Sequence, residues 1–535
     1  MRSFIRYDLI FPKIARLACI RTPYFMAFLI MAISLVVVAM TTEKLTHTSD
    51  EAEHVAAGMQ WWQEGHYDYN YDPKHPPLAR ALMAAPLYFM GLRNNDQRLE
   101  NINVYTDDSI GNMRVGEELL QSGGLHDYMI RLGLIRSMLL PFYMLSMWIV
   151  FIWAKELYGE WPAVASLGLY ATLPPILSHA GLAMTDMTYI ATCMLALYLC
   201  MRWLSDPTIS RSIMFGGAVA LAVVSKFSSL VHIPCGIAAL VAVNYYIEGR
   251  LITMKHLKTL PYALSVAMML ILLVYRCDIY PLLSGISALV DMNNKGAAQW
   301  LFGPLHGQSV WYFFPVLFFF KTPVPFLAVS AIAAYCILCG IDRKGSQVMA
   351  ISLSIMLVSM MSHINIAIRH ILILYPLLAI PAGNTLVWMM GTKNIRRPYV
   401  VGICVLALGW QCIDMVRYFP DYIPYFNVFA GDNPAKIAIV SNFDNDENLL
   451  LLKKVLNRRR INEAYVCFEG LHANHMPPAF FMPNKNFSPC PYEVMPGWTV
   501  VKKQSKAIFP EKFTWLDKLT PVETIDHTLE LYFVP

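Results

Sequence analysis

Long apolar runs constrain this chain more than any other feature. Eleven of them are interpreted as membrane-spanning helices, because about 20 mostly apolar residues cross roughly 30 Å of hydrocarbon. They lie at residues 24–41, 132–153, 162–179, 185–203, 212–226, 229–246, 261–275, 322–340, 347–363, 368–390 and 399–415. Only 15% of the 535 residues are Asp, Glu, Lys or Arg, whereas soluble proteins carry about 25%. We therefore predict a polytopic α-helical membrane protein and exclude an ordinary soluble enzyme.

The positive charges predict which way the chain is inserted. If the N-terminus lies in the cytoplasm, the segments on that side hold 16 Lys and Arg residues, and the short loops on the other side hold almost none. The 16 are Arg2, Arg6, Lys13, Arg16, Arg21, Lys155, Arg202, Arg211, Arg250, Lys255, Lys258, Arg343, Lys344, Lys393, Arg396 and Arg397. We predict a plasma (inner) membrane protein with its N-terminus inside and its C-terminus outside. The membrane accounts for the net charge of +5, so no nucleic acid partner is expected.

Three domains follow from this topology. Residues 1–23 form a cytoplasmic N-terminus, residues 24–415 a transmembrane domain with an outer loop at 42–130, and residues 416–535 an extracytoplasmic domain. The last domain has the alternation and turns of a small α/β fold. Within it we expect strands at 436–442, 463–468, 497–503 and 528–534, and a helix at 446–460. Cys467 and Cys490 both lie there and could pair if that side is oxidising.

Two acids follow the first span directly. Asp50 and Glu51 are adjacent, and Thr48 or Ser49 could cap a helix that begins there. On that helix Asp50 and His54 lie four residues apart and share a face. Such acids can simply complement the helix dipole. Near a membrane surface, however, a carboxylate is costly unless it is used or paired.

Further along the same loop, Pro76 and Pro77 suit the first turn of a helix that lies at the membrane surface. Lys74, His75 and Arg80 occupy the start of this helix. There they could receive an anionic head group, helped by the free backbone N–H groups. The alternative is that these cations meet ordinary lipid phosphates.

Other polar residues recur at the outer ends of later spans. These are Asp186, Lys226, Lys321, His363, Arg369 and His370. Each alone is explained by a helix cap or by a cation that reaches the interface. Together with the acids they favour an active site for a phosphate-bearing lipid, in which acids take a proton and cations hold the phosphate. A divalent cation could bind Asp50 and Asp186, but no close pair of ligands requires one.

The motifs, taken in order, resemble the GT-C glycosyltransferases that use a polyprenyl-phosphate sugar donor. The likeness is to the bacterial branch related to protein O-mannosyltransferases and aminoarabinose transferases, glycosyltransferase family 39. It extends from about residue 45 to the C-terminus. The matching segments are DEAEHVAAG (50–58), HPPL (75–78), SHAGLAMTD (178–186), SKFSSL (225–230), WYFFPVLFFFKTPVPFL (311–327), IAIRHILILYPLLAIPAG (366–383), YFPDYIPYFNVFAGDNP (418–434) and VSNFDND (440–446).

The resemblance implies a GT-C fold and transfer of a sugar, with inversion, from a polyprenyl-phosphate donor to a protein, lipid or glycan on the outer face. It implies that Asp50 is the catalytic base with Glu51 as support. It places Asp186, with His54, in the acceptor or metal region. The residues implied to bind the donor phosphate are His75, Arg369, His370, Lys321 and Lys226, and Lys74, at the start of the surface helix, is assigned to the same group. The tail departs from the branch, because Asp444 is followed by Asn445 and Asp446 rather than by Trp-Gly.

Two other functions fit the same composition. A transporter or flippase for a polyprenyl-linked lipid would need spans, outer cations and a lipid groove, but it usually has ionisable residues at mid-membrane and repeated halves. A non-catalytic partner in glycan assembly would not need the Asp50–Glu51 pair.

The outer loop at 276–310, with Asp291, Lys295, Trp300 and His306, is the segment expected to select the acceptor.

Overall fold

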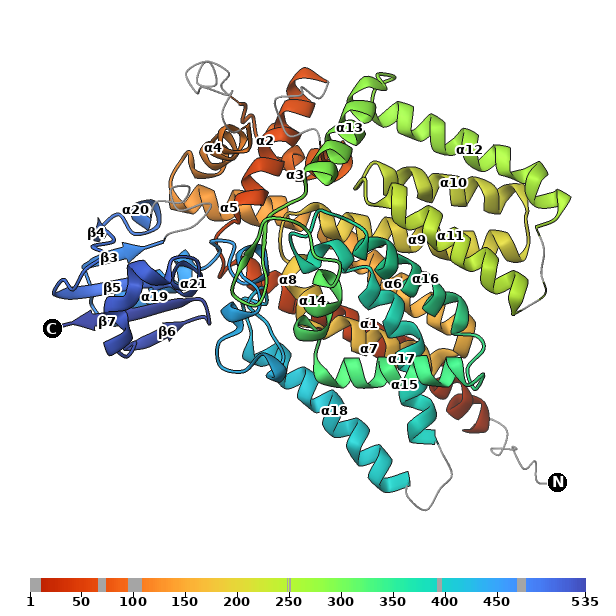
Figure 1. Cartoon of the computed structure of the whole chain (residues 1–535). Coiled ribbons are helices and arrows are strands. Elements are labelled where there is room, and N and C mark those ends of the chain that lie inside the picture. The colour runs from red at the N-terminus through yellow and green to blue at the C-terminus, as the bar shows by residue number, and fades with distance from the viewer. Residues whose placement is uncertain are drawn as a thin grey trace, which may run out of the picture.

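Helices occupy all eleven stretches that the sequence predicts to span a membrane (Figure 1). The computed structural model describes residues 11–65, 74–94, 108–247, 249, 252–391, 397–468 and 478–535. The helices in question are α1 (Phe11–Thr42), α6 (Leu140–Tyr158), α7 (Glu160–Ala171), α9 (Thr185–Ser205), α10 (Ile209–Val223), α11 (Ser229–Tyr246), α12 (Met254–Val274), α15 (Val324–Leu338), α16 (Ser346–Met360), α17 (Leu374–Gly391) and α18 (Arg397–Arg417). They form the helical body of the molecule.

The helical membrane class is confirmed, while the number of spans stays a prediction. Within the described residues, six helices are long and apolar enough to cross a membrane. A seventh span is added if α15 is counted together with α14 (Phe313–Lys321), which meets it at 118°. Some predicted spans are broken, since a short helix, α8 (Pro174–Ala180), follows α7, and a single 3-10 turn, η3 (Ile368–Ile371), precedes α17.

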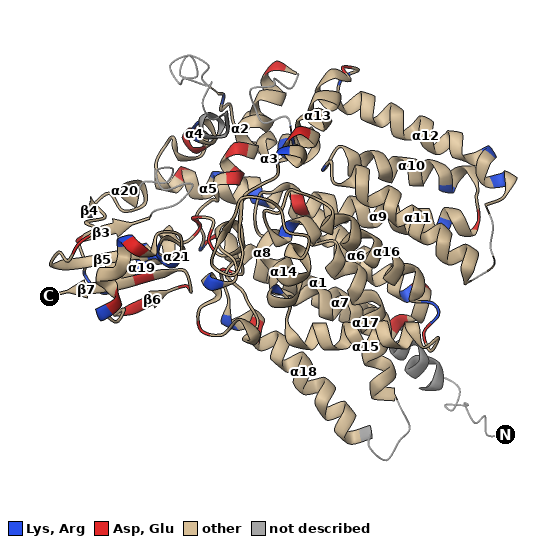
Figure 2. Ribbon diagram, in the orientation of Figure 1, with Lys and Arg blue, Asp and Glu red and all other residues tan. Residues whose placement is uncertain are grey.

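Charged residues are sparse on the helical body (Figure 2). Lys and Arg lie near the ends of α10 and α12 that point away from the C-terminus, and both signs of charge gather at the opposite side of the molecule. Arg2, Arg6, Arg250, Lys393 and Arg396, which also support the predicted orientation, lie outside the described residues. The orientation itself remains a prediction.

Small residues let the helices of the body approach closely, as is common in membrane proteins. At the crossing of α7 and α17, Gly383 faces Ser166, and a Cβ added to the glycine would lie only 2.2 Å from the Ser166 Oγ. The Ser166 hydroxyl donates a hydrogen bond to the Ile380 carbonyl across the same contact. The absence of a side chain at residue 383 therefore sets the distance between these two helices.

The described part of the predicted first outer loop contains a layer of helices that lies beside both the body and the C-terminal module (Figure 1). Its helices are α2 (Ser49–Glu64), α3 (Pro77–Phe89), α4 (Asp108–Gln121) and α5 (Leu125–Ser137). Met59 and Met83 of this layer share one hydrophobic core with Leu452 and Leu456 of α19 (Leu449–Arg458). The second outer segment contains α13 (Tyr280–Lys295) and a short antiparallel hairpin of β1 (Gln299–Trp300) and β2 (Leu305–His306).

The chain ends in a small α/β module, as predicted. Its five strands lie in the order β4-β3-β5-β7-β6, with β3 parallel to β4 and β5, and β7 antiparallel to β5 and β6. They are β3 (Glu463–Cys467), β4 (Asn486–Pro489), β5 (Gly497–Lys502), β6 (Glu523–Ile525) and β7 (Leu529–Val534). Helix α19, two short helices, α20 (Pro478–Phe481) and α21 (Lys503–Ile508), and the 3-10 segment η7 (Pro510–Lys518) complete the module. Cys467 and Cys490 form a disulfide with their Cα atoms 4.6 Å apart, which answers the question the sequence left open.

The prediction of a strand over residues 436–442 is wrong. This segment forms 3-10 turns, η5 (Pro434–Lys436) and η6 (Val440–Asn442), after a similar turn, η4 (Val428–Ala430). Val440 has a φ of 59°, outside the extended region that a strand needs. Ile437 and Ile439 are buried in the core of the helical body instead of in the sheet. The apolar alternation therefore reflects burial against helices.

Carboxyl groups are buried where the module meets the body. Asp421 accepts hydrogen bonds from the Ile423 N–H (3.0 Å) and the Asn448 amide (2.9 Å), and it also shares a hydrogen bond with Asp526. Burial raises the pKa of Asp421 to about 6. Burial, and next the nearby Asp421 charge, raise the pKa of Asp526 well above its usual range. A protonated Asp526 can donate this hydrogen bond to Asp421.

The substitution Asp526→Asn should weaken the pH dependence of stability. A raised pKa means that the folded chain keeps a proton that the unfolded chain releases, so this stability is present below the unfolded pKa of about 4 and is lost as the pH rises through the folded pKa. An Asn amide can donate to Asp421 at every pH. The variant should therefore gain roughly 1–3 kcal/mol over the wild type at pH 8 and nothing at pH 4. Thermal unfolding at both pH values measures this, and an equal difference at both would contradict it.

Candidate active site

A capping box begins helix α2 at the residues that the sequence singles out. The Thr48 hydroxyl accepts a hydrogen bond from the Glu51 N–H, and the Glu51 carboxylate accepts one from the Thr48 N–H (2.8 Å). This reciprocal pair satisfies backbone groups that a helix start otherwise leaves without partners. The predicted cap is confirmed at Thr48, and Asp50 consequently lies in the first turn of the helix.

Glu51 is fixed by more than the cap. Arg136 of α5 donates two hydrogen bonds of 2.8 Å to the Glu51 carboxylate, and the Ala183 N–H donates a third of 2.7 Å. Glu51 is fully buried. Burial alone would raise its pKa, but the Arg136 charge and these hydrogen bonds outweigh burial and lower the pKa. Glu51 thus holds α2, α5 and the turn before α9 together and does not face the cavity described next.

The other acid of the pair faces a small cavity at the junction of α2, α9, the α10–α11 turn and η3. The cavity has a volume of about 40 Å³, enough for a few water molecules. Its lining consists of Asp50, Glu53, His54, His75, Met184, Thr185, Asp186, Lys226 and Arg369. Six residues that the sequence predicts for the site therefore lie together, namely Asp50, His54, His75, Asp186, Lys226 and Arg369. The first and the last of these are 319 residues apart in the sequence.

Two acid–cation pairs dominate this cavity. The Lys226 ammonium lies 2.6 Å from the Asp186 carboxylate, and both side chains are buried. The Arg369 guanidinium forms an ion pair with Asp50. The Asp50 side chain is 27% exposed, compared with 2% for Asp186. Asp50 is therefore the acid that a substrate can reach more readily.

Sequence reasoning missed Glu53 and misplaced Arg80. Glu53 lies three residues after Asp50, on the same face of α2, and this spacing could have identified it. Arg80 is fully buried in α3, where it forms an ion pair of 3.7 Å with Glu53 and donates to the His54 Nδ1 at 3.2 Å. Because Arg can only donate, the Nδ1 of His54 carries no proton. Arg80 orients the acid and the imidazole rather than an external head group.

A glycine allows α2 and α3 to bring these groups together. A Cβ added at Gly58 would lie 2.0 Å from the Arg80 carbonyl oxygen. The backbones can approach to this distance because residue 58 has no side chain. The close approach also places the ring of His75 edge to face against His54, with the ring centres 4.9 Å apart.

Three residues predicted to bind the phosphate do not line the cavity. The Lys321 ammonium donates to the carbonyls of Ile423 (2.5 Å) and Asn442 (2.6 Å) and lies over the Phe426 ring. Lys321 thus fastens the start of the tail to α14. His370 follows Arg369 in η3 and packs against Phe314. Lys74 precedes His75 at the entry to α3, outside the lining.

The residues around the cavity do not fit a divalent cation. Asp50 and Asp186 are both engaged by cationic side chains, Arg369 and Lys226. Within the described ranges, no group of three or more His, Cys, Asp or Glu residues has the geometry of a metal site. Ca²⁺ and Mg²⁺ need several oxygen ligands that converge on one point. No step of the chemistry below is therefore assigned to a metal.

Residues 133–275 match the sequence model of a family described as Dolichyl-phosphate-mannose-protein mannosyltransferase. This stretch includes Asp186 and Lys226. The match confirms the resemblance to the polyprenyl-phosphate-dependent glycosyltransferases of GT-C type that the motifs indicated. No curated protein matches the sequence.

Two solved structures are among those similar to this chain. The ArnT structure from Cupriavidus metallidurans bound to undecaprenyl phosphate has a TM-score of 0.49 and 11% identity, covering 94% of this chain and 97% of that chain. The archaeal oligosaccharyltransferase AglB from Archaeoglobus fulgidus, in complex with an inhibitory peptide and a dolichol-phosphate, has a TM-score of 0.47 and 11% identity, covering 74% of this chain and 55% of that chain.

Proposed function

We propose that this chain transfers a sugar from a polyprenyl-phosphate donor to an acceptor hydroxyl on the extracytoplasmic side of the membrane. Two observations support the proposal. One is the family match over residues 133–275, since that family is described by a dolichyl-phosphate-mannose donor. The other, which contributes most, is the cavity in which acids and cations from four separate segments meet at one end of the apolar helices.

In the proposed reaction, Asp50 acts as the general base. Its carboxylate takes the proton of the acceptor hydroxyl, and the oxygen attacks the anomeric carbon of the donor sugar. The bond between that carbon and the phosphate oxygen breaks, and the polyprenyl phosphate leaves with the electron pair. Because a single displacement occurs, the configuration at the anomeric carbon inverts. General-base catalysis of this kind contributes about 10²–10⁴-fold.

The cations of the cavity have a second role in the proposal. A phosphate that gains charge in the transition state is stabilised by donors already aimed at it. Arg369, Lys226 and His75 face the cavity and can supply them. Arg369 then exchanges its pairing with Asp50 for the phosphate and leaves Asp50 to accept the acceptor proton. Lys321 and His370 lie outside the lining and have no direct part in this scheme.

The substitution Arg369→Ala tests the proposed donor site. It should weaken the binding of polyprenyl phosphate about 10–100-fold, because charge-assisted hydrogen bonds to a phosphate contribute about 1.5–3 kcal/mol. Calorimetric titration of the purified chain with a short-chain polyprenyl phosphate measures the Kd. Arg343→Ala is the matched control, since Arg343 is exposed at the predicted cytoplasmic side. Equal affinity of both variants and the wild type would argue against the assignment.

A further inference from the structure

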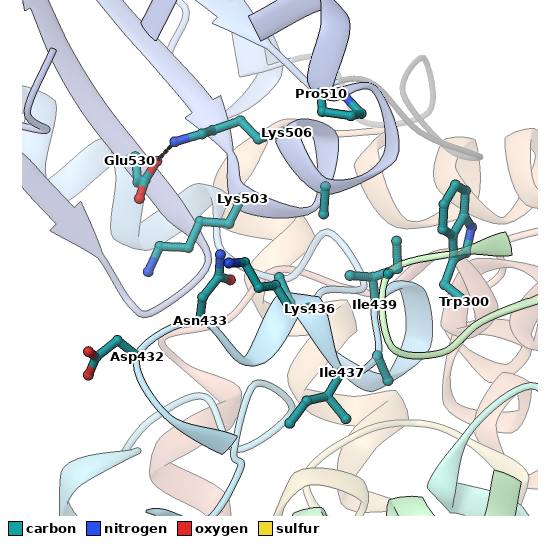
Figure 3. A pocket seen from close by; sticks show the side chains of 14 residues that line it. Trp300, Asp432, Asn433, Lys436, Ile437, Ile439, Lys503, Lys506, Pro510 and Glu530 are labelled. Carbon is teal, nitrogen blue, oxygen red and sulfur yellow. Dashed lines mark hydrogen bonds and ion pairs between the residues drawn. The ribbon is translucent and has the colours of Figure 1, made fainter. Parts of the chain in front are cut away.

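A second and larger cavity lies between the β1–β2 hairpin and the C-terminal module (Figure 3). Its volume is about 400 Å³, within the range of sites for small molecules. Four segments line it: the hairpin through Trp300, the tail segment 432–439, helix α21 with the residues around it, and strand β7. The acid–cation cavity of the proposed transferase does not share any of these lining residues.

Three lysines approach this cavity from one side (Figure 3). The Lys506 ammonium is held by the Glu530 carboxylate at 2.9 Å and by the Tyr532 hydroxyl. The side chains of Lys436 and Lys503 make no hydrogen bond or ion pair with the part of the chain that the structure describes. Asp432 and Glu530 also line the cavity, and the Glu530 charge acts on Lys503. Three lysines against two carboxylates leave the lining with a net positive charge, which favours an anionic ligand.

The opposite wall suits a sugar ring. Trp300 lies across the cavity from the lysines, and Ile437 and Ile439 lie between them (Figure 3). An indole offers a large flat apolar surface on which the C–H face of a saccharide can pack. The Asn433 amide, which also lines the cavity, can exchange hydrogen bonds with hydroxyl groups. Apolar, amide and ammonium groups are thus combined in one space.

The lining segment continues into the proposed catalytic site. Phe302 of the hairpin donates its N–H to the Ile437 carbonyl at 2.9 Å. Three residues after Ile439, the Asn442 side chain accepts from the Ile368 N–H (3.0 Å) and donates to the Ile366 carbonyl (3.1 Å). These two contacts hold the backbone directly before Arg369. One short segment therefore forms the floor of the larger cavity and positions the cation that pairs with Asp50.

We propose that the cavity between the hairpin and the module is an acceptor subsite that binds a saccharide carrying a phosphate or carboxylate group. Lys436 and Lys503 bind the anionic group, and Trp300 packs against the ring. The inference rests on the proposed function, because it names the class of acceptor for that reaction. It also gives a role to Trp300, which lies in the loop predicted to select the acceptor.

Binding of glucose 1-phosphate to the purified full chain in nanodiscs tests the subsite. The wild type should bind glucose 1-phosphate at least tenfold more tightly than glucose, and the double variant Lys436→Gln/Lys503→Gln should lose at least tenfold in affinity. Trp300→Ala should weaken binding of glucose 1-phosphate but not of inorganic phosphate.

The matched control is Lys454→Gln/Lys518→Gln, which removes two exposed lysines outside the lining. Lys436→Arg/Lys503→Arg keeps the charges and should keep the affinity, which separates charge loss from misfolding.

Equal affinity of the double Gln variant and its control would overturn the subsite, as would wild-type affinities that do not distinguish glucose 1-phosphate from glucose. Binding of polyprenyl phosphate, measured on the same samples, separates this outcome from a failure of the proposed function. Nanodiscs with and without phosphatidylglycerol identify the source of the anion. If phosphatidylglycerol competes with glucose 1-phosphate and the competition requires Lys436 and Lys503, the site binds lipid-linked head groups. If the lipid does not compete, the site binds soluble glycans.

Discussion

The variant Asp50→Asn should transfer sugar about 10²–10⁴-fold more slowly than the wild type, the usual contribution of a general base. Asn has nearly the same size as Asp but cannot take a proton from the acceptor hydroxyl. The loss should appear mainly in kcat, because Asp50 is assigned to proton transfer and not to binding of the donor phosphate. Release of polyprenyl phosphate from a labelled donor, measured at saturating donor, gives the rate.

A control distinguishes this loss from a general effect of removing a negative charge. Asp517→Asn removes an exposed acid of η7 in the C-terminal module and should change the rate by less than a factor of two. If Asp50→Asn retains a rate within a few-fold of the wild type, Asp50 is not the base. Glu53, which faces the same cavity, would then be the next acid to replace.

Replacing Arg136 with Met should destabilise the fold by about 3–5 kcal/mol, because it leaves a buried carboxylate without its cation. Glu51 is fully buried and would keep the hydrogen bonds from the Thr48 and Ala183 N–H groups and from the Thr48 hydroxyl, none of which carries a positive charge. Arg136 also donates to the Thr46 carbonyl at 2.8 Å, so the segment before α2 would loosen as well. Thermal or denaturant unfolding of the detergent-solubilised chain measures the loss.

The double variant Glu51→Gln/Arg136→Met isolates the electrostatic part of this effect. Gln can still accept hydrogen bonds from the two N–H groups, but it carries no charge. The double variant should therefore recover about 1–3 kcal/mol of the stability lost in Arg136→Met. If the second substitution instead adds to the first, burial of an unpaired charge is not the cause of the loss.

The acids and cations of the site could be predicted largely because they sit at helix ends. Asp50, Asp186 and Arg369 each follow or precede an apolar run, and the order of motifs resembled a known group of transferases. The helices then bring the three residues to one cavity. Charge next to a span therefore predicted which residues gather there, although it did not predict which acid pairs with which cation.

Roles that depend on backbone partners or on tertiary burial could not be predicted. Lys321 is a cation at a helix end like Lys226, yet its partners are two carbonyl groups in the tail. No side-chain pattern marks a carbonyl as a partner. Glu51 was expected to support Asp50 at the reaction centre. Its partner, Arg136, lies 85 residues further along the chain, in α5. Nothing in the sequence around Arg136 indicates that its positive charge pairs with Glu51.

The tail shows a further limit of patterns. Residues 436–442 alternate as a strand does, and yet they pack on the helical body. Their neighbours 446–460 and 463–468 were predicted correctly as a helix and a strand, and they bury apolar side chains in the core that the module shares with the helices of the first outer loop. Periodicity indicates that a residue is buried, and the tertiary structure decides against which surface.

Following the anomeric carbon through the reaction tests the proposed sugar transfer most directly. Polyprenyl-phosphate hexoses and pentoses labelled with ¹³C at C1 would be incubated with the purified chain and an acceptor extract from the cells that produce it. We expect the label of one donor to move to the acceptor fraction with inverted configuration at C1, together with release of polyprenyl phosphate. Label that arrives with retained configuration, or that stays on the lipid with every donor, would contradict the proposed inverting transfer.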